Sequence, residues 1–265
     1  MIRITDKSLC SGCTACEAIC TRQCIVRHRD REGFDYPVAN PDMCIQCGRC
    51  EEVCPMINKA KRSRDDVSAG EFHEAALQVL SRSGVVYGVG IEPDKTVSHV
   101  QSHDVESLNV NRYVQSDLYA SFEEIRDYLA DNTEVLFCGT PCQAEGLVSY
   151  LGGEPENLKI YSFECMGVAS PGLWQKYNLI ADKKNMYWSL YQKGLTLRPS
   201  CYKCSHLARE VKCDMAKREE FFKGVHSAKD LRGYLSKYAQ ESIIFIIQNM
   251  CHGFSALIPG SKNRK

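Results

Sequence analysis

The sequence predicts two units of different fold class, a small α+β unit at the N-terminus followed by an α/β unit with a partly parallel sheet. Two observations carry this prediction. Nine of the 16 cysteines lie between Cys10 and Cys54, whereas from residue 71 onward short apolar runs alternate with segments of helical periodicity. A chain of 265 residues is long enough for roughly one or two such units, each with its own core.

Composition limits the classes of partner and compartment. The formal net charge is zero, which argues against binding to nucleic acid or to an anionic membrane. The N-terminal residues MIRITDKS contain no apolar signal stretch, so we interpret the cysteines as those of a cytoplasmic metalloprotein rather than as disulfides. In residues 241–260 the fully apolar run is only Ile243–Ile247. We expect no transmembrane segment there, but a C-terminal helix packed on the body, with a peripheral membrane or partner contact as the alternative.

The cysteines of the N-terminal unit form one motif twice. In each copy two residues separate the first three cysteines, and three residues separate the third from the fourth. The copies are Cys10, Cys13, Cys16, Cys20 and Cys44, Cys47, Cys50, Cys54. This is the bacterial-type ferredoxin run, in which the fourth cysteine ligates the other cluster. We therefore expect two 4Fe–4S clusters, one held by Cys10, Cys13, Cys16 and Cys54 and the other by Cys44, Cys47, Cys50 and Cys20.

A fifth cysteine, Cys24, follows the first copy. It occupies a position where a small apolar residue usually packs, so we expect a buried free thiol. Thr21 replaces the usual proline after the fourth cysteine, which leaves open that Cys24 rather than Cys20 is the ligand. Zinc is the rival metal, but its sites are usually built from separated cysteine pairs. Short strands are expected at residues 2–5, around 25–26 and at 33–38, as in an α+β ferredoxin-like domain.

The predicted elements divide the chain into four parts. Residues 1–57 form the two-cluster unit, 58–70 a linker of mixed charge, 71–209 the α/β unit and 210–265 a helical tail. In the α/β unit we expect strands at 85–92, 96–102, 135–138 and 158–163, and helices at 71–83, 121–130, 143–151 and 171–179. The first two strands should pair across the turn at 93–95.

The turn CGTPCQ, residues 138–143, joins a predicted strand to a helix. Free N–H groups and the helix dipole favour an anion there. Gly139 allows close backbone approach, and Thr140 can cap the helix with Gln143 nearby. A flavin phosphate or a cluster edge would suit this place, and the alternative is a well-capped turn without a ligand.

Several stretches of the chain together resemble one family. VLFCGTPCQ, ECMGVASP, LRPSCYKC, VVYG and YVQSD are similar to segments of the beta subunits of coenzyme F-420 hydrogenase and dehydrogenase, some of whose bacterial relatives carry a two-cluster ferredoxin unit in front. The resemblance covers residues 1 to about 209 with gaps, and KREEFFKG resembles the family's C-terminal end. The segments between ASP and RPSC and after the CxxC pair are short here, so the chain looks like an internally shortened member.

The resemblance implies an oxidoreductase that binds FAD and passes electrons between a ferredoxin-type carrier or other redox protein and a small-molecule hydride acceptor. It also implies a third 4Fe–4S cluster at the family's core cysteines, with zinc or unlinked buried thiols as alternatives. The matching cysteines are Cys142, Cys165, Cys201 and Cys204. The matching flavin-site residues are Ser68 and Gly70, in a turn where Ala69 replaces a glycine, and Tyr113, Gln115 and Ser116, for which a polar turn at a strand end is the alternative.

Two other functions compete with this enzyme. One is a non-catalytic electron carrier with a ferredoxin unit on a shortened, flavin-free scaffold, and the other is a zinc-stabilised interaction module. No residue stands out as a catalytic acid or base, because His73, His99 and His103 are more typical of surface or internally bonded histidines.

Overall fold

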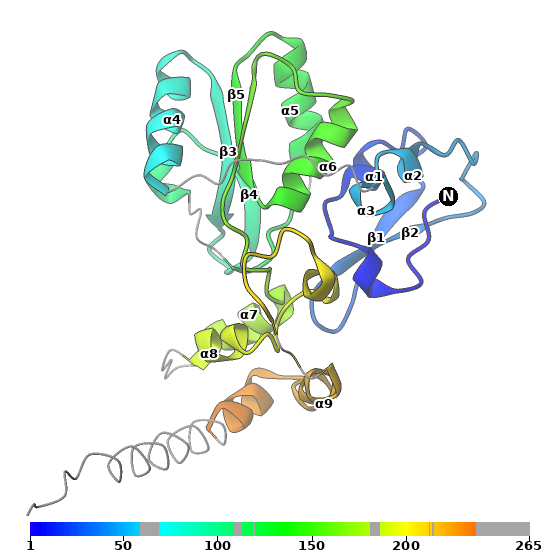
Figure 1. The fold of residues 1–265 in the computed structure, drawn as a ribbon, viewed down its shortest axis with the longest axis vertical. Helices are drawn as coiled ribbons and strands as arrows, with labels where there is room; N and C mark the ends of the chain where they lie inside the picture. Colours follow the sequence, from blue (N-terminus) through cyan, green and yellow to red (C-terminus); the bar gives the residue numbers. More distant parts are fainter. Residues whose placement is uncertain are drawn as a thin grey trace, which may run out of the picture.

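The computed structural model describes residues 1–58, 69–108, 113–118, 120–180, 186–211, 213 and 215–236. The described elements fall into three groups: the N-terminal unit, a sheet covered by helices, and a group of helices that follows the sheet (Figure 1). Expectations for the remaining residues, including Ser68 and the helix at 241–260, lie outside the described residues.

The N-terminal unit is built around a two-stranded antiparallel sheet, β1 (Ile25–Arg29) with β2 (Asp35–Ala39). Its short helical elements are η1 (Lys7–Leu9), α1 (Ala15–Ala18), α2 (Arg49–Glu52) and α3 (Pro55–Asn58). The two predicted strands after the first motif are therefore present. The third expected strand, near the N-terminus, is reduced to an isolated bridge between Arg3 and Val38.

The central sheet has the strand order β4-β3-β5-β6. The strands are β3 (Val85–Ile91), β4 (Val97–Gln101), β5 (Val135–Gly139) and β6 (Leu158–Ser162). β3, β5 and β6 run parallel, whereas β4 pairs with β3 as an antiparallel edge strand. The prediction of a mixed, partly parallel sheet is confirmed, and the first two strands do form a hairpin.

Helices cover both faces of this sheet (Figure 1). One face carries α4 (Ala69–Ser81), whose Phe72, Ala76 and Val79 are buried at helical spacing. The other face carries α5 (Ser121–Ala130) and α6 (Pro141–Leu151). α6 begins two residues before the expected start, because Thr140 and Gln143 form a capping box and Pro141 suits the first helical turn.

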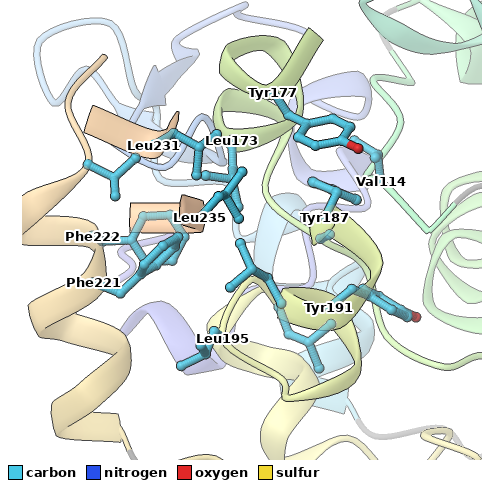
Figure 2. Packing of buried hydrophobic residues seen from close by; sticks show 14 of the residues in the cluster. Val114, Leu173, Tyr177, Tyr187, Tyr191, Leu195, Phe221, Phe222, Leu231 and Leu235 are labelled. Atoms are coloured by element: carbon cyan, nitrogen blue, oxygen red, sulfur yellow. The ribbon is translucent and has the colours of Figure 1, made fainter. Parts of the chain in front are cut away.

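The remaining helices enclose a separate core. They are α7 (Pro171–Asn178), α8 (Met186–Gln192), α9 (Met215–Gly224) and helical residues 228–236, with η2 (Val105–Ser107) and η3 (Pro199–Lys203) elsewhere in the chain. Figure 2 shows Phe221 and Phe222 of α9 beside Leu231, Leu235 and Leu173. The stretch between ASP and RPSC that looks shortened in the sequence contributes Tyr187 and Tyr191 to this core. Within the described ranges, no helix is long and apolar enough to cross a membrane.

A buried chain of hydrogen bonds joins β4 to the start of α6. His99 Nε2 lies 3.0 Å from the carbonyl oxygen of Cys138, and His99 Nδ1 lies 2.9 Å from Ser116 Oγ. Gln143 Nε2 donates to Ser116 Oγ at 3.0 Å, and Gln143 Oε1 accepts from the Thr140 N–H. A neutral imidazole with its proton on Nε2 satisfies every partner. Burial lowers the pKa of His99 to about 4, consistent with that neutral form.

We expect replacement of His99 by Phe to lower the free energy of unfolding at pH 7.5 by about 1–3 kcal/mol, because Ser116 and the Cys138 carbonyl lose a buried partner. The pH dependence should also change. The folded-state pKa is depressed, so His99 favours folding above its unfolded pKa of about 6.5, and this contribution, up to about 3 kcal/mol, is lost as pH falls toward 4. Denaturant titrations between pH 4 and 7.5 should therefore show a shallower loss in His99→Phe.

The control is His73→Gln, because the His73 side chain is exposed. An equally steep loss of stability in His99→Phe and in the unsubstituted protein would contradict this assignment.

Candidate metal centres

The first cavity gathers three cysteines of one motif and the last cysteine of the other. Cys10, Cys13 and Cys16 lie between η1 and the end of α1, and Cys54 immediately precedes α3. All four line one cavity of about 80 Å³. The structure therefore places Cys54 with the first motif, as the crossed arrangement requires.

The second cavity has the reciprocal composition. Its thiols are those of Cys20, Cys24, Cys44, Cys47 and Cys50. The first three cysteines of the second motif thus meet Cys20, which is the fourth of the first. Cys24 is buried as expected, but it also lines the cavity, with its Sγ 3.4 Å from Cys20 Sγ. Both thiols therefore lie where the fourth ligand of this site is expected.

The two cysteine loops share one backbone conformation. Gly12 and Thr14 in the first loop have φ of 75° and 61°, and Gln46 and Gly48, at the same offsets in the second, have 56° and 80°. Alternation of left-handed residues turns successive N–H groups toward the inside of a loop, which creates a concavity for an anion such as an iron–sulfur centre. A left-handed threonine is strained, and such strain concentrates at functional sites.

Backbone donors also reach the sulfurs directly. The Gln46 N–H donates to Cys44 Sγ at 3.4 Å, and the Ile2 N–H donates to Cys50 Sγ at 3.3 Å. Hydrogen bonds of this kind stabilise thiolate sulfur in iron–sulfur proteins. The donor set of the N-terminal cavities therefore fits 4Fe–4S clusters.

Several of the gathered thiols resist ionisation without a bound cation. Burial, and then the neighbouring Cys10 and Cys54, raise the pKa of Cys13 to about 12. Burial also raises the pKa of Cys16 and Cys54. Cys20 differs from these thiols. Burial opposes its ionisation, but hydrogen bonds from the backbone and side chain of Cys24 and from the backbone of Arg22 hold its pKa below the usual value. Metal binding must displace the protons from such thiols.

A third cavity, of about 270 Å³, gathers the four cysteines that the family resemblance singled out. Its lining includes Cys142, Cys165, Cys201 and Cys204. Cys142 lies in the first turn of α6 and Cys201 in η3. Burial raises the pKa of Cys142 well above its usual value, and the three other thiols raise it further.

The third cavity adjoins the first. Ser11 and Met56, both from the N-terminal unit, line both cavities. In the part of the chain that is described, no group of three or more His, Cys, Asp or Glu side chains has the arrangement needed for a single metal ion. Each cavity is instead lined by four or five cysteines.

A glycine permits the contact between the two units. α1 and α3 of the N-terminal unit lie against α6 (Figure 1). A Cβ added at Gly146 of α6 would lie 2.7 Å from Cys13 Cβ and 2.9 Å from Cys13 Sγ, closer than ordinary packing allows. The missing side chain of Gly146 therefore lets the first cysteine loop reach α6.

The described residues expected to contact flavin are divided among four places in the structure. Gly139, Thr140, Gln143 and Ser116 come together at the start of α6, where the polar side chains bond one another and His99. The Tyr113 ring packs 4.8 Å from the rings of Trp188 and Tyr191, and Gly70 lies in the first turn of α4. Gln115 and Ser116 line the first cavity. As flavin contacts, these residues remain a prediction.

Two buried arginines at the interface were not anticipated from the sequence. Arg218 of α9 pairs with Glu32, in the turn between β1 and β2. Arg198, directly before η3, donates to the carbonyl oxygen of Cys10 at 2.7 Å. Their partners lie more than 180 residues away in sequence, so no local pattern could have revealed these contacts.

Comparisons with known proteins match the N-terminal part of the chain. A family model described as a 4Fe-4S dicluster domain matches residues 9–57, and a second model with the same description matches residues 36–82. These matches support iron–sulfur binding and electron transfer by this part. The resemblance of later residues to beta subunits of coenzyme F-420 hydrogenase and dehydrogenase stays a prediction.

Individual relatives are ferredoxins. An uncharacterized ferredoxin of Methanocaldococcus jannaschii is 44% identical over 50 residues, which are 19% of this chain and 77% of the relative. The ferredoxin 7Fe of Hydrogenibacillus schlegelii is 38% identical over 53 residues, 20% of this chain and 62% of the relative. Ferredoxin-1 of Caulobacter vibrioides is 32% identical over 69 residues, 26% and 56% respectively. The chain thus spans less than two thirds of the latter two relatives.

We expect Gly146→Ala to displace the first cysteine loop, because its methyl group would overlap Cys13. The expected result is a loss of about 1–3 kcal/mol in the free energy of unfolding and a lower iron content after anaerobic reconstitution. Gly153→Ala is the matched control, since a Cβ at Gly153 has no heavy atom within 4 Å. Unchanged iron and stability in Gly146→Ala would show that the loop does not depend on this contact.

The closeness of Cys20 and Cys24 makes a second prediction. Cys24→Ala should retain the full iron content, and Cys20→Ala should retain a large part of it, because the second thiol lies beside the first. The double variant Cys20→Ala/Cys24→Ala should lose about four irons, those of one cluster. Iron and acid-labile sulfide on the purified variants decide the outcome. Full retention in the double variant would remove both cysteines from the ligand set.

Proposed function

Because this chain belongs, through residues 9–57, to the family of 4Fe–4S dicluster ferredoxins, we propose that it is an iron–sulfur electron-transfer protein with three cluster sites. The N-terminal unit would hold two clusters in crossed ligand sets, and the α/β unit would hold the third. A redox protein or ferredoxin would be the partner.

One observation carries the proposal: each N-terminal cavity combines three thiols of one motif with the fourth thiol of the other. Bound at such sites, 4Fe–4S clusters supply reversible one-electron transfer. The chain's own residues hold the sulfurs in two bent loops, donate backbone N–H groups to them, and bury the first site between two units.

The third site rests on four cysteines from separate segments that line one cavity: Cys142, Cys165, Cys201 and Cys204. A set of four thiols fits one 4Fe–4S cluster, and zinc is the alternative occupant. Because Ser11 and Met56 border this cavity and the first, the protein would hold the two centres as neighbours without a large intervening layer.

A flavoprotein oxidoreductase is the second candidate function, and one feature favours it. The first cavity extends beyond the cysteines to Gln115, Ser116, Arg27 and Trp174, which offers polar, cationic and aromatic side chains next to a cluster site. FAD there would allow two-electron exchange with a small-molecule hydride acceptor. Against this, the polar atoms of Thr140, Gln143 and Ser116 already bond each other, so we place the flavin-free carrier first.

Anaerobically purified protein should contain about twelve iron and twelve sulfide ions per chain, four of each from three clusters. The double variant Cys142→Ala/Cys204→Ala should lose about a third of both while keeping the N-terminal clusters. Cys138→Ala is the matched control, because Cys138 is buried in the sheet and should leave the content unchanged.

Flavin is quantified on the same sample. Stoichiometric FAD would favour the oxidoreductase over the carrier. Stoichiometric zinc with almost no sulfide would overturn both and favour the zinc-stabilised interaction module.

A further inference from the structure

One arginine extends from the α/β unit into the first cysteine loop. The Arg198 side chain is fully buried. Its Nε donates to the Cys10 carbonyl oxygen at 2.7 Å, and its Nη2 lies 3.5 Å from Cys10 Sγ. Nη1 donates to Gln115 Oε1 at 2.7 Å, and Nη2 also donates to the Asp35 carbonyl oxygen at 2.9 Å. The guanidinium therefore bonds the sulfur and the backbone of the same expected ligand.

The positive charge of Arg198 has no carboxylate partner among the described residues. The Asp35 carboxylate pairs with Arg29 instead, at 2.8 Å. The rings of Phe34 and Tyr36 lie over the guanidinium, with centroids 5.2 and 4.5 Å from its central carbon, and exclude water from it. Burial of an unpaired charge is costly, so native proteins supply an opposite charge or a metal centre.

A set of cysteine thiolates around an iron–sulfur core can supply that opposite charge, because the ligands bind in their deprotonated form. We propose that Arg198 is the internal counter-charge of the first cluster and raises its reduction potential. Reduction adds one electron to the centre, and no bond forms or breaks. A fixed positive charge with an N–H directed at a ligand sulfur favours the added negative charge.

Among the described residues that line the second cavity there is no buried guanidinium, and the Met1 amino group that lines it pairs with Glu51 Oε1 at 3.1 Å. The sulfurs of Cys44 and Cys50 accept hydrogen bonds from backbone N–H groups. The two arginines that line this cavity, Arg22 and Arg49, are exposed to solvent, which screens their charge. Arg198 should therefore make the two N-terminal clusters electrostatically different although their motifs are alike. This inference rests on the proposed cluster at Cys10, Cys13, Cys16 and Cys54.

The test is a reductive titration of the full, anaerobically reconstituted chain, followed by electron paramagnetic resonance. In Arg198→Gln one midpoint potential should become more negative while the potential of the second N-terminal cluster stays unchanged. Cys10→Ser identifies the signal, because replacing a ligand alters the spectrum of its own cluster. Arg198→Lys, which keeps the charge but not the forked hydrogen bonds, should give a smaller negative shift.

A neutral double variant controls for loosening of the interface. Glu32→Gln/Arg218→Gln removes a buried ion pair between the N-terminal unit and α9 without changing net charge or touching a cysteine, and it should leave all potentials in place. If Arg198→Gln loses iron, the decision passes to the second neutral variant, Arg198→Met, which fills the apolar surroundings of Phe34 and Tyr36. An unchanged potential in Arg198→Met overturns the proposal. Unchanged potentials in Arg198→Gln with intact clusters would also overturn it, yet leave the proposed function standing. Absence of clusters from the unsubstituted protein would instead refute the proposed function.

Discussion

The close approach of the first cysteine loop to α6 and to Arg198 fixes how the two units of this protein lie relative to each other. Gly146 provides the space for Cys13, and Arg198 bonds Cys10 from the opposite part of the chain. The buried Glu32–Arg218 pair joins the N-terminal unit to α9 as well. A ferredoxin-like unit that moved independently would need none of these contacts. Here residues of both units line the first cavity.

The secondary structure was largely accessible from the sequence, because local patterns determine it. The four strands of the sheet and the helices around it follow the apolar periodicity closely, and the earlier start of α6 follows from Thr140, Pro141 and Gln143. The grouping of the eight N-terminal cysteines was also readable, because the spacing of each motif fixes a loop. The four later cysteines were suggested only by family resemblance, and the structure brings them to one cavity.

Tertiary contacts explain what the sequence could not reveal. Arg198 appears as one more basic residue, and nothing near it indicates that its partner is Cys10. Gly146 appears as an unfavourable residue inside a helix until Cys13 is seen against it. Ser116 and Gln143, expected to face a flavin, also belong to a hydrogen-bonded chain with His99. A polar residue at a strand end can contact a ligand or bond to other side chains, and its local sequence does not indicate which.

The shared left-handed bends of the two loops have a consequence for the surfaces around them. Because the backbone shapes the interior of each loop, the intervening side chains can diverge: Ser11, Gly12, Thr14 and Ala15 in one copy correspond to Ile45, Gln46, Gly48 and Arg49 in the other. The first copy is enclosed by α6, whereas in the second Cys47 and Ile45 are exposed. The two copies of one motif therefore differ in exposure: the first cysteine loop is covered by another part of the protein, and the second is open to solvent.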